Sequence, residues 1–399
     1  MKRIAAPLAC ATSSLSLTGA TNGFRLALIT RTWRPPHGAY ANAASDANAA
    51  ADANDADEKE AVAATIRDVA HAAGVSQSTV SRAMSMPELV NPATRARVRS
   101  AARKLGYQPN RAARGLITGR TGNLGLIVPD LANPFFSAIV KGVQMAARTA
   151  DYSVFVADTD EDASAEVELL RALSKQVDGI VLCSPRSVDA ELAGIGTDTP
   201  VVLINRHFDN RPSVTFDSAD GMRQAVEHLA ALGHRRIAYV AGPRTSWSNG
   251  ERERGLRQTA KVTRSDIVHL GFFPPFFDGG VAAADLALAS GATALIAYND
   301  VVALGLLSRL GARGVAVPGR LSVLGFDDIG MSAMTHPALT TVSAPTREAG
   351  RATVALLLQL LAGVADTTAL HRELPTQLIV RATTGVVPAP DHRAAEVTR

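Results

Sequence analysis

The chain has 399 residues, more than one ordinary domain needs, and 47% of them are hydrophobic, which is enough for a substantial core. It contains no apolar run of about eighteen residues or more, so no membrane-spanning segment is predicted. The two cysteines, Cys10 and Cys183, cannot form a disulfide framework, and metal-ligand spacing is absent. The composition therefore favours the cytoplasm and predicts neither a metal nor another cofactor.

The net charge of +4 is unevenly distributed. Between Thr65 and Gly119 there are nine basic and two acidic residues, a net charge of +7, whereas residues 1–64 carry six of each sign. The excess positive charge is thus concentrated in one short segment, which predicts that this segment binds a polyanion.

Residues 1–64 are predicted to form a disordered N-terminal extension. The stretch Ala39–Asp57 consists almost entirely of Ala, Asn, Asp and Ser, which cannot bury a core. Met1-Lys2-Arg3 and the following apolar run faintly resemble a signal peptide, but Pro7 interrupts that run. We favour a solvated tail or an upstream start site over an export signal.

Residues 65–107 are predicted to form three short helices. Thr65 can cap the first helix, Ser76 the second and Asn91 the third, and Gly106 ends the third. A fourth short helix is expected from Pro109-Asn110 to about Leu116, followed by a linker that reaches residue 121.

The second predicted helix carries side chains suited to reading DNA bases. Gly74 permits the tight turn that precedes it. The helix presents outward the polar residues Gln77, Ser78, Ser81 and Arg82. Amides pair with adenine, arginine with guanine, and hydroxyls with bases or phosphates. An ordinary helical hairpin with polar outer faces is the alternative, and the local charge of +7 argues against it.

From Asn123 onward, apolar runs alternate with amphipathic stretches. Alternation of strands and helices predicts an α/β core with parallel, doubly wound sheets, and about 270 residues require two lobes. The predicted strands are Leu124–Val128, Val154–Ala157, Gly179–Leu182, Val201–Ile204, Ile237–Val240, Ala294–Ala297 and Leu321–Phe326. The clearest predicted helices are Ser137–Thr149, Ala163–Gln176, Ala219–Leu232 and Val301–Gly311.

Polar residues follow the predicted strands at the edge where doubly wound sheets bind ligands. Their amides, carboxylates and guanidinium groups suit a polyhydroxyl ligand, and nearby aromatic rings could stack on a sugar. For each polar residue the alternative is a helix cap or surface group, and for the rings it is core packing. The polar candidates are Asn133, Asp158, Asn205, Arg206, Asn299 and Asp327, and the aromatic ones are Phe135, Phe136, Phe216 and either Phe276 or Phe277.

The segment Ile66–Arg120 resembles the head of the lactose and galactose repressor family of bacterial transcriptional regulators. The matching pieces are Asp68-Val69-Ala70, Gly74-Val75-Ser76, Thr79-Val80-Ser81-Arg82 and Leu105-Gly106-Tyr107-Gln108-Pro109-Asn110. The resemblance continues to about Gly385 through five blocks, which begin at Asn123, His228, Asn299, Ser322 and Pro337.

This resemblance implies an all-α helix-turn-helix head on a two-lobed core like that of periplasmic binding proteins. It further implies a repressor that binds a pseudo-palindromic operator as a homodimer and responds to a small ligand, expected to be a sugar. Gln77, Ser78 and Arg82 would read the major groove, a hinge helix would run from Asn110 to Leu116, and Leu116 would wedge open a base step. The full set of expected DNA-binding residues is Thr65, Ser76, Gln77, Ser78, Thr79, Ser81, Arg82, Asn110, Arg111, Ala113, Arg114 and Leu116.

For the core, the resemblance makes Arg252 and Asp327 the principal ligands of the effector's hydroxyl groups, with Asn299 beside them. Asn205 stands where many relatives have Asp, Ala344 where many have Gln, and Leu256 where an aromatic residue is usual, so the effector need not be a common one. The expected effector-binding residues are Asn133, Phe135, Phe136, Asp158, Asn205, Arg206, Phe216, Arg252, Phe276, Asn299 and Asp327.

The expected domain limits follow from these segments. The head spans 65–109, the hinge and linker 110–121, the core 122–385 and a flexible tail 386–399. Within the core, an N-terminal lobe takes about 122–216 and 346–372, and a C-terminal lobe about 217–345 and 373–385. The tail lacks leucine heptads, so we expect a dimer and not a coiled-coil tetramer.

Two other classes of protein are alternatives to a regulator. An exported sugar-binding protein would share the core but would need a clear signal peptide and no helix-turn-helix. An enzyme is disfavoured because neither a Gly-x-Ser-x-Gly elbow nor a phosphate-binding glycine loop occurs. His234, in a helix-to-strand turn, is interpreted as structural.

Overall fold

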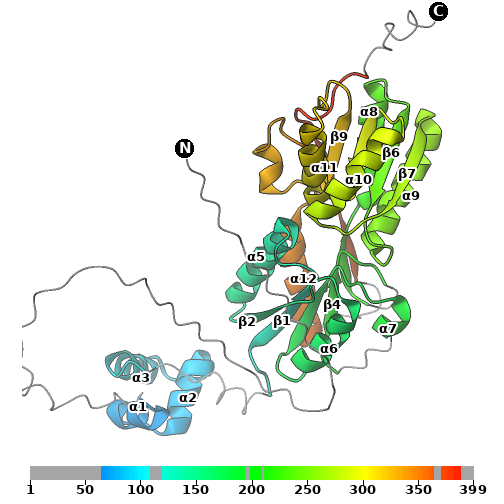
Figure 1. Cartoon of the computed structure of the whole chain (residues 1–399). Helices are drawn as coiled ribbons and strands as arrows, with labels where there is room; N and C mark the ends of the chain where they lie inside the picture. The colour runs from blue at the N-terminus through cyan, green and yellow to red at the C-terminus, as the bar shows by residue number, and fades with distance from the viewer. Residues whose placement is uncertain (1–63, 108–118, 194–197, 209–210, 364–369, 388–399) are drawn as a thin grey trace, which may run out of the picture. The chain divides into compact units, whose positions relative to one another are not determined.

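The computed structural model describes residues 64–107, 119–193, 198–208, 211–363 and 370–387. The described residues form a small helical head and a larger α/β core (Figure 1). The expectations for the N-terminal extension up to residue 63, for the hinge helix and for the end of the tail lie outside the described residues.

The head consists of three helices around a small apolar core. Its elements are α1 (Ile66–Ala73), α2 (Gln77–Ser85), the 3₁₀ turn η1 (Pro87–Leu89) and α3 (Pro92–Lys104). Its core is made mostly of small side chains, which let the helices approach closely: Val69, Ala70, Ala73, Val80, Ala83, Val98, Ala101 and Ala102.

The predicted caps of the head helices are confirmed. Thr65 and Asp68 form a capping box at α1, and Gly74 ends that helix in the left-handed conformation at φ 63°. The Ser76 side chain accepts the backbone N–H of Thr79 at 3.2 Å, and Asn91 caps α3 ahead of Pro92.

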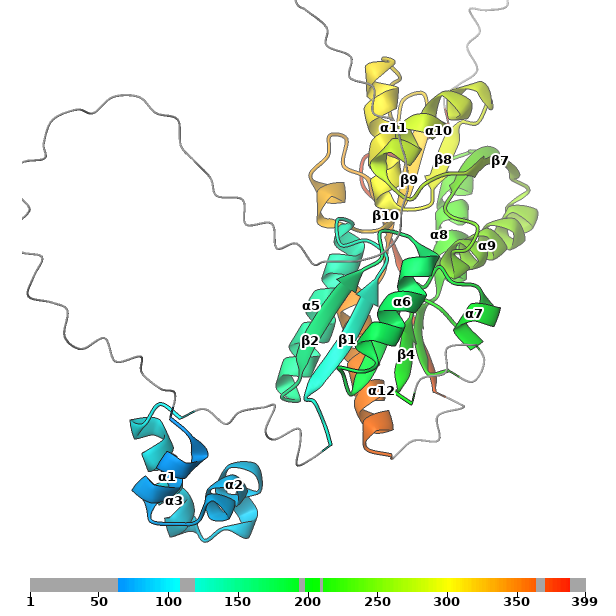
Figure 2. The same cartoon turned by 60° about the horizontal axis from the view of Figure 1, so that its bottom comes forward.

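Two lobes, here called the N-lobe and the C-lobe, make up the core, which confirms the predicted α/β class (Figures 1 and 2). In the described residues, the N-lobe has a six-stranded parallel sheet in the order β11-β5-β4-β3-β1-β2. Its elements are β1 (Asn123–Val128), α5 (Pro134–Thr149), β2 (Ser153–Asp158), α6 (Ala163–Leu173), β3 (Gly179–Cys183), α7 (Asp189–Ala193), β4 (Val201–Ile204), β5 (Ser213–Phe216), α12 (Thr346–Leu361) and β11 (His371–Leu374).

The C-lobe sheet has the order β12-β10-β9-β8-β6-β7 and is parallel except where β12 pairs with β10. Its elements are α8 (Ser218–Ala231), β6 (Arg236–Ala241), α9 (Trp247–Thr263), β7 (Asp266–Phe272), α10 (Phe277–Ala289), β8 (Ala294–Ala297), α11 (Asp300–Ala312), β9 (Ser322–Asp327), the 3₁₀ turn η2 (Gly330–Ala333), β10 (Thr340–Ser343) and β12 (Gln377–Ile379).

Both faces of each sheet are covered, as near-continuous apolar strands require. In β6, Ile237 and Tyr239 pack toward α8 and α9, whereas Ala238 and Val240 pack toward α10 and α11. The chain passes between the lobes three times, after β5, after β10 and between β11 and β12. This arrangement brings the carboxyl ends of both sets of strands to the region between the lobes, where ligands bind in such sheets.

Candidate functional site

The outer face of α2 is the candidate DNA-reading surface of the head. Gln77, Ser78 and Arg82 are exposed, while Val80 and Ala83 on the opposite face are buried. Because residues 77, 78, 81 and 82 share one side of the helix, the fold presents amide, hydroxyl and guanidinium groups together. These are the groups that pair with base edges.

A hydroxyl cluster fixes the beginning of α2. The Ser76 hydroxyl lies 2.8 Å from that of Ser78 and 2.9 Å from that of Thr79. Thr65 is likewise engaged in the α1 cap, where its backbone N–H donates to Asp68 at 2.8 Å. These bonds to Thr65 lower the pKa of Asp68 and keep it ionised near the positive end of the helix dipole. The remaining expected DNA-binding residues, Asn110, Arg111, Ala113, Arg114 and Leu116, lie outside the described residues.

The second candidate site is a cavity between the two lobes. Most of its lining follows the carboxyl ends of strands in both sheets, and the rest comes from α5 and α9. Side chains fill most of it. The free volume that remains is about 10 Å³, which is about the space needed to hold one water molecule. The lining residues are Asn133, Phe135, Phe136, Glu161, Arg186 and Asn205 from the N-lobe, and Arg252, Pro275, Tyr298, Asn299 and Asp327 from the C-lobe.

Arg252 and Asp327 face each other on the C-lobe side. Arg252 is 3% exposed, and its Nη2 donates to Asp327 Oδ1 at 3.3 Å while its Nη1 donates to the Tyr298 carbonyl oxygen. Its guanidinium lies 3.7 Å from the centre of the Phe326 ring. The aromatic ring and the carbonyl thus hold Arg252 in place independently of the carboxylate.

Asp327 ends β9 and is buried with a backbone φ of 116°. Its pKa is raised to about 8, mainly because the carboxyl group is buried; Arg252 opposes this rise and the nearby Asp300 adds to it. The carboxyl group therefore holds a proton more readily than an exposed aspartate does, and a ligand that donates hydrogen bonds to it favours the ionised form.

An ion pair faces these residues from the N-lobe side. Arg186 Nη2 donates to Glu161 Oε1 at 2.8 Å, Nε donates to the other carboxylate oxygen, and Nη1 donates to the Ser184 carbonyl at 2.8 Å. The two side chains are 4% and 12% exposed. A guanidinium so deeply buried requires its carboxylate partner.

Two asparagines of the cavity also cap helices. Asn133 Oδ1 accepts the Phe135 N–H at 3.0 Å at the start of α5. Asn299 Oδ1 accepts the Val302 N–H at 2.8 Å and so caps α11, and its Nδ2 donates to the Pro275 carbonyl at 3.0 Å, so both ends of the amide are engaged by the fold. The interpretation of Asn299 as a cap therefore accounts for its contacts without a ligand.

Two polar atoms of the cavity lining are buried without a hydrogen-bond partner in the described residues. They are Asn205 Oδ1, an acceptor, and Arg252 Nε, a donor. Such atoms normally have partners. A ligand with hydroxyl groups could satisfy both, since a hydroxyl donates and accepts.

The structure places seven of the eleven expected effector residues around this cavity and the other four outside it. Asp158 holds a loop by accepting Leu131 N at 2.8 Å, and Arg206 forms an ion pair with Asp189. Phe216 packs edge-on against Phe135 with ring centres 5.9 Å apart, and Phe276 precedes α10. Asp158, Arg206 and Phe216 thus have structural contacts that explain their positions.

Sequence reasoning missed four lining residues, namely Glu161, Arg186, Pro275 and Tyr298. Each follows the end of a strand, so the rule that selected the other candidates could have found them. His234, the residue weighed as catalytic, is buried and lies within 3.1 Å of Thr293 Oγ1, Ser322 Oγ and the Gly385 carbonyl oxygen, which supports its structural interpretation. In the described part of the chain, no helix is long and apolar enough to cross a membrane.

Two family models match the chain. Residues 65–110 match bacterial regulatory proteins of the lacI family, and residues 226–384 match a periplasmic binding protein-like domain. The first covers the head with its candidate DNA-reading surface, and the second covers most of the C-lobe with Arg252 and Asp327.

Individual proteins resemble the chain over most of its length. The HTH-type transcriptional repressor CytR of Escherichia coli (strain K12) is 34% identical over 341 residues, which is 83% of this chain and 99% of CytR. The lac repressor dimer bound to operator and the anti-inducer ONPF superimposes with a TM-score of 0.72 at 31% identity and covers 81% of this chain and 99% of its own. The regulator CelR in complex with cellobiose gives a TM-score of 0.61 at 30% identity, over 80% of this chain and 99% of CelR.

Proposed function

We propose that this chain, which belongs to the lacI family of bacterial regulatory proteins, is a cytoplasmic repressor whose affinity for operator DNA is controlled by a sugar. The observation that carries the proposal is the pairing, in one chain, of an exposed polar helix α2 with a polar cavity between two lobes. We assign it no catalytic step.

The head accounts for recognition of DNA. In this proposal α2 enters the major groove, where Gln77, Ser78 and Arg82 contact base edges, while Thr65, Ser76, Thr79 and Ser81 position the helix. The positively charged segment from Thr65 to Gly119 supplies the attraction to phosphates that does not depend on sequence.

The cavity accounts for the response to a ligand. Arg252 and Asp327 on one side, and Asn133 and Asn205 on the other, would bind hydroxyl groups, and Phe135 and Phe136 would pack against the apolar face of the ring. The cellobiose complex of CelR shows that a relative with this fold binds a sugar. The acceptor at Asn205 Oδ1 and the donor at Arg252 Nε suit the same class of ligand.

Because the cavity is small, binding of a sugar requires a change in the conformation of the core. A free volume of about 10 Å³ cannot hold a sugar, so the ligand would bind an arrangement in which the lobes stand farther apart or lining side chains have moved. The ligand then shifts the balance between two arrangements by its different affinity for them. A coupling of about 1–3 kcal/mol between the cavity and the DNA is enough for a useful switch.

Replacing Arg82 with alanine tests the DNA half of the proposal. A duplex is first selected from a random library with the wild-type protein. Arg82→Ala should then weaken binding to that duplex by about 1–3 kcal/mol, roughly 5- to 150-fold in Kd, and relax the preference at one base position. Arg97→Ala, an exposed arginine on α3, is the matched control. Equal losses on selected and random DNA for Arg82→Ala would remove it from base reading.

The assembly is expected to be a dimer, because two heads on one duplex require two-fold symmetry and a pseudo-palindromic site. The lac repressor that resembles this chain binds its operator as a dimer. Multi-angle light scattering should give twice the chain mass of 41.7 kDa. A stable tetramer, or a monomer that binds the selected duplex at full affinity, would contradict this expectation.

A further inference from the structure

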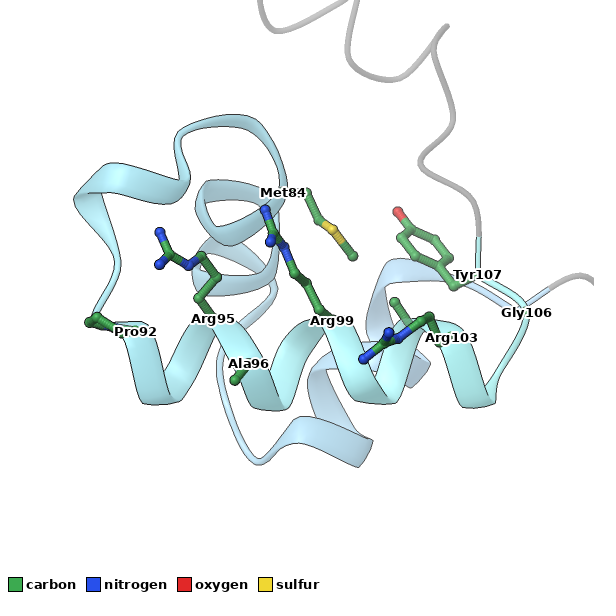
Figure 3. A pocket seen from close by; sticks show the side chains of 9 residues that line it. Met84, Pro92, Arg95, Ala96, Arg99, Arg103, Gly106 and Tyr107 are labelled. Carbon is green, nitrogen blue, oxygen red and sulfur yellow. The ribbon is translucent and has the colours of Figure 1, made fainter.

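The head carries an open groove on the side of α3 that faces the end of α2 (Figure 3). Met84 of α2 borders the groove, which ends at Tyr107, the last described residue of the head. The residues that line it are Met84, Pro92, Arg95, Ala96, Arg99, Ala102, Arg103, Gly106 and Tyr107.

Three of the lining residues are arginines spaced four positions apart. This spacing places Arg95, Arg99 and Arg103 on one face of α3. Arg95 is half-buried and donates from Nη1 to the Pro87 carbonyl at 3.0 Å, so it holds the fold of the head. Arg99 and Arg103 are exposed, and neither forms a hydrogen bond or an ion pair with another described residue.

No acidic residue of the described head lines the groove, which therefore carries a positive charge. The described head has seven basic residues and two acidic ones, a net charge of +5. Of the two acidic residues, Asp68 belongs to the α1 cap, and neither it nor Glu88 lines the groove. Arginines one turn apart repel each other, and an anion between them relieves that repulsion.

The position of the groove indicates which anion it meets. Met84 belongs to α2, the helix that would lie in the major groove, and Tyr107 leads into residues 108–118, which contain the segment expected in the minor groove. A phosphate backbone separates the two grooves of a duplex. If α2 and the segment after Tyr107 occupy neighbouring grooves, the strand between them must pass the surface between Met84 and Tyr107.

We propose that Arg99 and Arg103 bind the phosphates of the DNA strand that runs between the two grooves. The inference rests on the proposed function and adds an anchoring surface on α3 to the reading surface on α2. These contacts fix the register of the head on the duplex and carry no sequence information. Planar guanidinium groups suit phosphates because they can donate two parallel hydrogen bonds.

The test compares two double variants of the full chain that lose equal charge from the same helix. Arg99→Gln with Arg103→Gln empties the groove of its free arginines. Arg97→Gln with Lys104→Gln is the control, since both residues are exposed on α3 and lie outside the groove. Fluorescence anisotropy with the selected duplex and with a random duplex, at salt concentrations from 50 to 200 mM, gives the slope of log Kd against log salt. Circular dichroism checks that both variants fold.

The groove variant should lose about four phosphate contacts per dimer, which lowers the magnitude of the salt slope by about 3.6. Its preference for the selected duplex over the random one should stay unchanged. The control should lower the magnitude of the slope by clearly less, because its side chains lie outside the groove. Equal slopes for the two folded variants, or an altered base preference in the groove variant, would overturn the inference. A wild-type protein that binds no duplex would instead refute the proposed function.

Discussion

Asp327→Asn should abolish the response to the effector while leaving the affinity for DNA without effector nearly unchanged. Asparagine has the shape of aspartate, so it fits the strained backbone at φ 116° without a new cavity. It lacks the charge that strengthens a hydrogen bond from a sugar hydroxyl, which is worth about 1.5–3 kcal/mol. Arg252 stays held by the Tyr298 carbonyl and the Phe326 ring.

The measurement needs the sugar that raises the wild-type melting temperature most, chosen from a panel of sugars, nucleosides and purines. Wild type and Asp327→Asn are compared for the thermal shift with this sugar and for its effect on binding to the selected duplex. Asp285→Asn is the matched control, because this carboxylate is 42% exposed and pairs with Arg309 and Arg313 away from the cavity. A folded Asp327→Asn protein that responds normally would exclude the proposed role, and an unfolded one would make Asp327 a purely structural residue.

The pH dependence of stability gives a second readout on the same proteins. Burial raises the pKa of Asp327 to about 8. The folded state therefore keeps the carboxyl proton up to about pH 8, whereas the unfolded state loses it above about pH 4. The contribution of this group to stability therefore falls between pH 4 and pH 8 and is constant above that. Asparagine has no such proton, so the melting temperature of Asp327→Asn relative to wild type should rise across this range. A constant difference would mean that the carboxyl group is ionised throughout.

Local signals explain which parts of the fold could be predicted. The caps at Thr65, Ser76 and Asn91 depend on residues at most three positions away, so the sequence displays them directly. The strand β11 was not predicted, because it is short and mostly polar. It pairs with β5, more than 150 residues earlier, and only that partner makes it a strand.

The candidate cavity shows the same division between local and distant information. The rule that ligands bind beyond strand ends selected Asn133, Asn205 and Asp327, which the structure places around one cavity. It also selected Phe216, whose side chain lies in the core behind Phe135, since a strand end does not reveal which face a ring takes. Arg186 follows β3 and fits the same rule, but its ion pair with Glu161, which lies 25 residues earlier and beyond the end of β2, is not visible in the sequence.

That ion pair supports the second large effect that we expect. Glu161→Gln should destabilise the core by about 3–5 kcal/mol, because it leaves the guanidinium of Arg186, 4% exposed, without a countercharge. For a core of this size, the melting temperature should fall by roughly 6–20 °C. Calorimetry or thermal denaturation of the full chain measures the change.

Two controls separate burial of charge from the loss of a hydrogen bond. Asp266→Asn breaks an exposed ion pair, in which the side chains of Arg236 and Asp266 are 49% and 59% exposed. This change should lower the free energy of unfolding by at most about 1 kcal/mol. The double variant Glu161→Leu with Arg186→Met removes both buried charges and should recover most of the stability that Glu161→Gln loses. If Glu161→Gln costs no more than Asp266→Asn, the Ser184 carbonyl and solvent suffice for Arg186. The pair would then be free to exchange its partners for a ligand, and Arg186 would join Arg252 as a donor in the cavity.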